Sequence, residues 1–62
     1  MSTVEQIRSF TELGFQMCKQ YDCDEVDLTP HIKRHLGEQE HLLETVVMEI
    51  KRRRYNMPSI YS

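Results

Sequence analysis

Two cysteines and two histidines have the composition of a zinc site. His31 and His35 are four residues apart, which places them on one side of a helix, and Cys18 and Cys23 precede them. Only seven residues separate Cys23 from His31, whereas a zinc finger of this ligand type has about twelve. Two interpretations therefore stay open, zinc ligation and a Cys18 thiol that packs as a small hydrophobic group. We assign no metal and no cofactor.

Three aspartates near the middle of the chain resemble a calcium loop only in part. Asp22, Asp24 and Asp27 could supply oxygen ligands, but no glycine stands at the sixth position of such a loop and no glutamate at the twelfth. The sequence also has no nucleophile with a base and an orienting group, and no glycine-rich phosphate loop. We therefore expect that this chain is not an enzyme.

A run of cations near the C-terminus is the strongest candidate for a binding site. Lys51 to Arg54 are followed by Tyr55, and an aromatic beside cations could stack on a nucleic-acid base. The net charge of −2 argues against a dedicated nucleic-acid domain, and cations also complement the C-terminal end of a helix dipole. Arginine and tyrosine are common anchors in protein interfaces. The predicted partner contacts are Arg52, Arg53, Arg54, Tyr55 and Tyr61.

The segment from Glu49 to Arg53, Glu-Ile-Lys-Arg-Arg, resembles the end of the helical hairpin in a family of small bacterial checkpoint inhibitors. Members of that family dock on a sensor histidine kinase. The resemblance implies a hairpin that binds a larger protein. It does not extend over the first helix or the following loop.

Two helices are expected to position these residues. Ser2 and Thr3, followed by Glu5 and Gln6, offer overlapping capping boxes, and apolar residues then recur at helical spacing, which predicts a helix over 3–20. The period is lost in an acidic turn over 21–29. Thr29 before Pro30 has the chemistry of a new helix start, which predicts a second helix over 30–54.

The two glycines test this arrangement. Gly14 lies within the apolar stripe of the first helix, where the lack of a Cβ would let another helix approach closely. Gly37 would end the second helix if it acted as a C-terminal stop, and a third helix would then start at Glu38. We favour a continuous helix because the apolar face keeps its phase across Gly37.

The predicted fold is an all-α antiparallel helical hairpin over residues 1–55, with a C-terminal tail over 56–62. The two apolar stripes are wider than one helix can cover, so we expect a homodimer that forms a four-helix bundle. The expected core and dimer seam are Ile7, Phe10, Met17, Leu36, Leu43, Val46, Val47 and Ile50.

The sequence also indicates where in the cell the protein acts. No apolar run reaches the roughly 18 residues of a membrane span, and the N-terminus lacks a signal-peptide pattern, so we expect no membrane association, a cytoplasmic location and reduced thiols. The predicted function is that of a small regulatory or adaptor protein that binds a larger protein. The alternative is a nucleic-acid-binding transcriptional regulator that uses the basic end.

Overall fold

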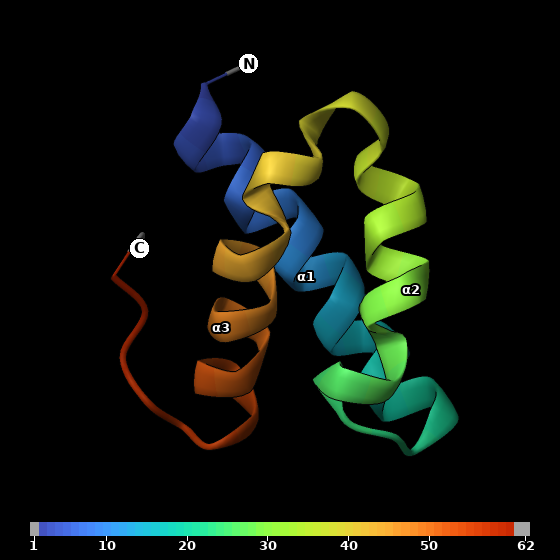
Figure 1. The fold of residues 1–62 in the computed structure, drawn as a ribbon. Helices are drawn as coiled ribbons and strands as arrows, with labels where there is room; N and C mark the ends of the chain where they lie inside the picture. Colours follow the sequence, from blue (N-terminus) through green and yellow to red (C-terminus); the bar gives the residue numbers. More distant parts are fainter. Residues whose placement is uncertain (1, 61–62) are drawn as a thin grey trace.

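The protein folds into three packed helices. The computed structural model describes residues 2–60, in which α1 spans Thr3–Tyr21, α2 spans Glu25–Leu36 and α3 spans Leu43–Arg54 (Figure 1). A 3₁₀ segment, η1, over Gly37–Leu42 joins α2 to α3. Within the described residues there is no strand, so the predicted all-α class is confirmed.

The second helix starts earlier than the sequence predicts. Residues 25–29, assigned to the acidic turn, form the first turns of α2, and Asp24 caps the helix by accepting from the Asp27 N–H at 3.0 Å. Acidic side chains at a helix start also complement the dipole. Pro30 lies inside α2, where it removes one helical hydrogen bond, to the carbonyl of the exposed residue Val26. The predicted start at Thr29 and Pro30 is therefore wrong.

The prediction of a continuous helix over 30–54 is also wrong, because the helix ends at Gly37. Gly37 has φ of +58°, and its N–H donates to the carbonyl of Lys33, which ends α2. The ψ of Gly37 is −118°, and this combination of φ and ψ lies outside the left-handed helical region and is readily adopted only by glycine. Leu42, at the end of η1, is buried in the core like the apolar residues of α2 and α3. The apolar residues therefore keep a helical spacing across the break, and their pattern did not reveal the end of α2 at Gly37.

The core lies between the three helices. Of the residues expected there, Ile7, Leu36, Val46 and Ile50 are buried, and Phe10, Met17, Leu43 and Val47 are partly buried against them. The list lacked four buried apolar residues, namely Cys18, Leu28, Ile32 and Leu42. Because α2 and α3 fold on each other as well as on α1, one chain buries much of the apolar surface for which we expected a second copy.

Gly14 is a point at which side chains from α2 and α3 approach the backbone of α1 closely. It is buried in α1, and a Cβ added there would collide with the side chain of Ile50 from α3. The same Cβ would lie 3.7 Å from Cδ1 of Ile32 in α2. The close approach expected at this glycine is therefore present, and it involves both other helices.

None of the described helices combines the length and the apolar character that a membrane span requires.

Candidate protein-binding surface

The three arginines at the end of α3 pair with three glutamates from different parts of the fold. Successive residues of a helix point about 100° apart, so Arg52, Arg53 and Arg54 extend in three directions. Arg52 pairs with Glu49 on α3, Arg53 with Glu12 on α1, and Arg54 with Glu25 on α2. The arginines of the predicted basic site therefore also form three ion pairs within the protein.

The pair between Arg54 and Glu25 joins the end of α3 to the start of α2. Glu25 is only 5% exposed, and its Oε2 accepts a hydrogen bond from Nη1 of Arg54. This hydrogen bond is the main reason that the pKa of Arg54 lies above its ordinary value. A buried carboxylate needs such a partner, since an unpaired buried charge is costly.

The pair between Arg53 and Glu12 joins α3 to α1 at a more open position. The Arg53 guanidinium donates to Glu12 and lies 4.3 Å from the centre of the Phe15 ring. Its hydrogen bond lowers the pKa of Glu12, and Gln16, which donates to Glu12 at 3.0 Å, lowers it further. The aromatic contact places the guanidinium between a carboxylate and a ring face, both of which attract a cation.

Arg52 and Glu49 hold the C-terminal segment against α3. Glu49 is 2% exposed. Nη1 of Arg52 donates to Oε2 of Glu49 at 2.5 Å, and the Ser59 hydroxyl donates to the other carboxylate oxygen. The Met57 N–H donates to the Arg52 carbonyl at 2.7 Å. Residues 56–60, which we call the strap, therefore turn back and run alongside α3 (Figure 1).

Four large apolar side chains remain exposed on the strap and the adjoining part of α3. Tyr55 is 59% exposed and Ile60 is 67% exposed, and Met48 and Met57 are exposed as well. Ile60 and Met48 line a common hollow of about 200 Å³ together with Glu44 and Arg52. We call Met48, Tyr55, Met57 and Ile60 the strap surface.

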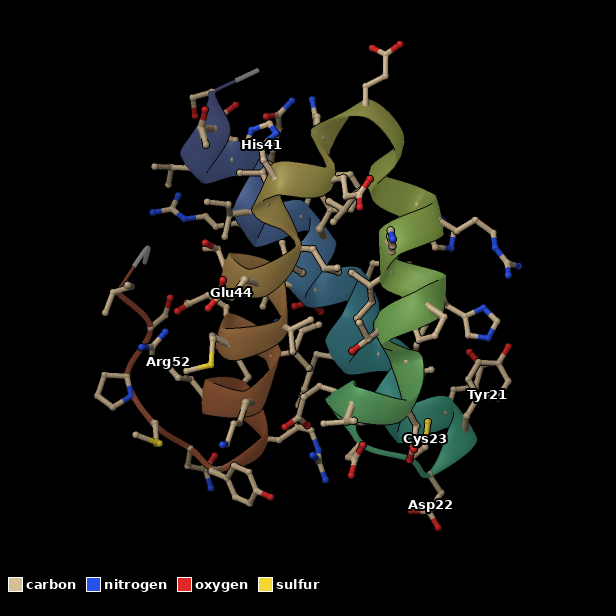
Figure 2. The ribbon with its side chains drawn as sticks, viewed as in Figure 1. Tyr21, Asp22, Cys23, His41, Glu44 and Arg52 are labelled. Carbon is tan, nitrogen blue, oxygen red and sulfur yellow. The ribbon has the colours of Figure 1, made fainter. Side chains whose placement is uncertain are left out.

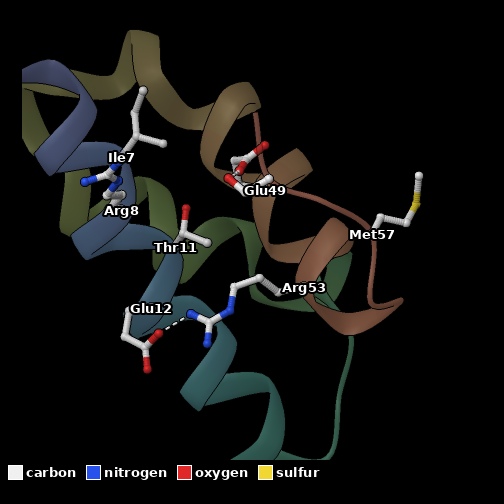
Figure 3. Close-up of a pocket in the computed structure, with 8 residues that line it drawn as sticks. Ile7, Arg8, Thr11, Glu12, Glu49, Arg53 and Met57 are labelled. Carbon is white, nitrogen blue, oxygen red and sulfur yellow. Dashed lines mark hydrogen bonds and ion pairs between the residues drawn. The ribbon is translucent and has the colours of Figure 1, made fainter. Parts of the chain in front are cut away.

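A second hollow, of about 340 Å³, lies between the strap and α1 (Figure 3). Met57 and Glu49 line it from one side and Ile7 and Thr11 from the other. The Thr11 hydroxyl oxygen is buried and has no hydrogen-bond partner among residues 2–60. The strap therefore lies over the contact between α1 and α3 and leaves this hollow unfilled.

The predicted partner residues fall into three groups. Arg52, Arg53 and Arg54 are partly buried in ion pairs, Tyr55 is exposed 5.5 Å from the Arg54 guanidinium, and Tyr61 lies outside the described residues. Met48, Met57 and Ile60 were not among the predicted contacts. For Met57 and Ile60 the available signal was the presence of apolar residues in a short tail beyond the last helix, whereas Met48 lies within α3.

The residues considered for zinc do not gather into a metal site. Within residues 2–60, no group of three or more His, Cys, Asp or Glu side chains could hold a metal ion. Cys18 is buried and Cys23 partly buried, and both are free thiols. Burial raises the pKa of Cys18 above its ordinary value, which agrees with the interpretation of Cys18 as a small hydrophobic group.

In comparisons with known proteins, no family model, curated protein or solved structure matches this chain.

Proposed function

We propose that this chain is a small cytoplasmic regulatory or adaptor protein that acts by binding a larger protein through the strap surface. The observation that carries the proposal is the exposure of four large apolar side chains, Met48, Tyr55, Met57 and Ile60, on one short segment and the helix beside it. Two of them share a hollow. Exposed apolar side chains that lie next to one another, as Met48 and Ile60 do, are typical of interaction sites.

The surroundings of the strap surface suit a protein interface. Glu44 and Arg52 border the hollow next to Met48 and Ile60, and a polar rim around an apolar centre is typical of such interfaces. In this proposal Arg52 acts indirectly, because its contact with Glu49 fixes the carboxylate that holds Ser59. A fixed strap loses less conformational entropy on binding than a free tail would.

Ile60 and Val26 offer a matched test. Their exposed fractions are 67% and 68%, but Ile60 belongs to the strap and Val26 to α2. Tagged wild-type, Ile60→Asp and Val26→Asp chains would be used for affinity capture from the source organism, with bound proteins identified by mass spectrometry. We expect a specific partner that Ile60→Asp loses and Val26→Asp keeps. A partner that both variants keep would contradict the proposal.

Self-association is a second proposal, but it needs a surface other than the helix stripes that form the core. Leu13, Met17 and Tyr21 are spaced four residues apart along α1, and Leu13 and Tyr21 are exposed. A homodimer that brings two such faces together would be a helical bundle, as the sequence suggested. Sedimentation should then show a dimer that Leu13→Glu converts to a monomer, and a wild-type monomer at all concentrations would exclude it.

Nucleic-acid binding through the basic end ranks below protein binding. The three arginines pair with carboxylates, whereas Lys51 is exposed, and paired cations attract phosphates less than free ones. Titration of random duplex DNA at low salt, followed by fluorescence anisotropy, tests this alternative. Affinity that falls steeply with salt and weakens in Lys51→Gln would favour it over protein binding.

A further inference from the structure

The two cysteines occupy both ends of the turn that closes α1. Asp22, which Figure 2 shows beside Cys23 at the end of α1, has a left-handed backbone with φ of +50°. The Cys23 N–H donates to the Cys18 carbonyl at 3.2 Å. This is the Schellman arrangement, in which the side chains at the two ends of that hydrogen bond often touch. In this chain both of those side chains carry a thiol.

The backbone geometry suits a disulfide between them. Standard bond lengths on either side of the 3.2 Å hydrogen bond limit the separation of the two Cα atoms to about 7 Å. Because the bonds are not collinear, the actual separation is shorter. Disulfides span Cα separations of roughly 4.4–6.8 Å, so the hydrogen bond holds the two residues close to the range that a disulfide requires.

The two thiols share one hollow but differ in access. Cys18 and Cys23 line a hollow of about 270 Å³ together with Phe15 and Arg54. Cys23 also lines a hollow of about 440 Å³ between α1 and α2, where Tyr21 and His31 lie. Cys18 is buried and Cys23 is partly exposed. A reagent from solution therefore reaches Cys23 more readily than Cys18.

We propose that Cys18 and Cys23 form a reversible dithiol site that small disulfides such as glutathione disulfide oxidise. The Cys23 thiolate attacks one sulfur of glutathione disulfide, forms a mixed disulfide and releases one glutathione. The Cys18 thiol then loses its proton to solvent, and the thiolate attacks Sγ of Cys23, which breaks the mixed disulfide and releases the second glutathione as a thiolate. The two released thiolates take up from solvent the two protons that the protein thiols lose. In total, two protein thiols are oxidised to one disulfide and one glutathione disulfide is reduced to two glutathione molecules.

Oxidation of the folded chain with glutathione disulfide tests the order of these steps. Samples are quenched with acid, alkylated and measured by intact mass. The wild type should gain a species lighter than the reduced chain by two hydrogen atoms, with neither cysteine alkylated. Cys18→Ser should stop at the mixed disulfide on Cys23, and Cys23→Ser should react at least about tenfold more slowly than the wild type. A wild type that stops at the mixed disulfide, links two chains or stays reduced would overturn the proposal.

A second measurement separates native geometry from chance encounter in a flexible chain. The ratio of protein disulfide to dithiol is measured at equilibrium with mixtures of glutathione and glutathione disulfide, once in buffer and once in concentrated urea. If the fold holds the two thiols in place, the equilibrium constant for the disulfide should be about tenfold larger in buffer. An equal or smaller constant in buffer would show that the folded turn opposes the bond.

Discussion

The side chain of Ile50 lies over the Cα of Gly14, and this contact sets how closely α3 approaches α1. Ile50 is fully buried, and Ile32 from α2 reaches the same place. A glycine inside a helix costs about 1 kcal/mol relative to alanine. In this fold that cost is offset by packing, because three helices share the space that a Cβ would fill.

We therefore expect Gly14→Ala to destabilise the protein although alanine is the better helix former. Overpacking a core costs about 1–3 kcal/mol, which should leave a net loss of about 1 kcal/mol after the gain in propensity. Chemical denaturation of the wild type and the variant measures this difference.

Ile50→Val provides the control for that prediction. Valine lacks the Cδ1 atom that the new Cβ would meet, so the combined variant should lose less stability than the two single losses together. The difference in stability between Ser9→Gly and Ser9→Ala, at an exposed position of α1, reports the gain in helix propensity from glycine to alanine alone. Additive losses in the double variant would show that the two residues do not compete for space.

The arginines should differ in their importance for stability. Arg54→Met leaves the buried carboxylate of Glu25 unpaired, whereas Arg53→Met leaves Glu12, about half of whose side chain is exposed, to solvent. Unpairing a buried charge costs more than breaking a surface pair. Urea denaturation should show a loss for Arg54→Met about twice that for Arg53→Met or more, and equal losses would contradict the structure.

The Glu12 pair predicts how stability depends on pH. The Arg53 hydrogen bond holds the pKa of Glu12 below its ordinary value of 4.5. A carboxyl with a lower pKa in the folded state favours folding above its ordinary pKa, and this contribution disappears as the pH falls through the folded value. Glu12→Gln should therefore be less stable than the wild type at neutral pH and equally stable in acid below both values.

Denaturation curves at several pH values and salt concentrations check this behaviour. The Arg53–Glu12 pair is exposed to solvent, and the Debye length in about 1 M salt is only about 3 Å. The difference in stability between wild type and Glu12→Gln at neutral pH should therefore shrink at that salt concentration. A difference between wild type and Glu12→Gln that persisted in acid would mean that Glu12 acts through packing.

The exposure of the two thiols predicts unequal alkylation. Because Cys18 is buried and burial raises its pKa, little of it is the reactive thiolate at neutral pH. Iodoacetamide under reducing conditions should modify Cys23 at least about tenfold faster than Cys18, with the two rates equal in urea. Peptide mapping by mass spectrometry gives both rates, and faster labelling of Cys18 in buffer would contradict its burial.

The sequence predicted periodic features better than local backbone geometry. The stripe of α1 and the close approach at Gly14 follow from spacing, which a single chain displays directly. The end of α2 depends on the +58° φ of Gly37, and the start of α2 on one side-chain cap by Asp24. The sequence pattern predicts that start at Thr29 and Pro30, whereas the structure uses the Asp24 cap earlier in the same acidic segment.

The ion pairs could not be predicted because they depend on that break. A continuous helix over 30–54 would have carried Arg53 and Arg54 beyond the end of the first helix, as a free basic end. The turn at Gly37 instead brings α3 back beside α1, so Arg53 meets Glu12, which is 41 residues away. Arg54 meets Glu25 for the same reason, across 29 residues. Long-range pairs of this kind follow from topology and leave no periodic mark in the sequence.

Thr11 and Thr29 give a final test of how polar groups are satisfied inside the fold. The buried hydroxyl of Thr11 has no partner among residues 2–60, whereas the Thr29 hydroxyl donates to the Glu25 carbonyl at 2.9 Å. Valine has nearly the same shape as threonine, so each substitution chiefly removes the hydroxyl. A buried polar group without a partner costs about 1–3 kcal/mol, whereas a typical hydrogen bond contributes about 1 kcal/mol.

We therefore expect Thr11→Val to stabilise the protein by about 1 kcal/mol and Thr29→Val to be neutral or destabilising by up to about 1 kcal/mol. Thermal and urea denaturation of the two variants measure both effects, and the change of residue type is the same in each. If Thr11→Val destabilised the protein as much as Thr29→Val or more, the Thr11 hydroxyl would have to be bonded in the hollow beneath the strap. The two substitutions should change stability differently because, of these two threonines, only Thr29 has a hydroxyl that bonds to a carbonyl one helical turn earlier.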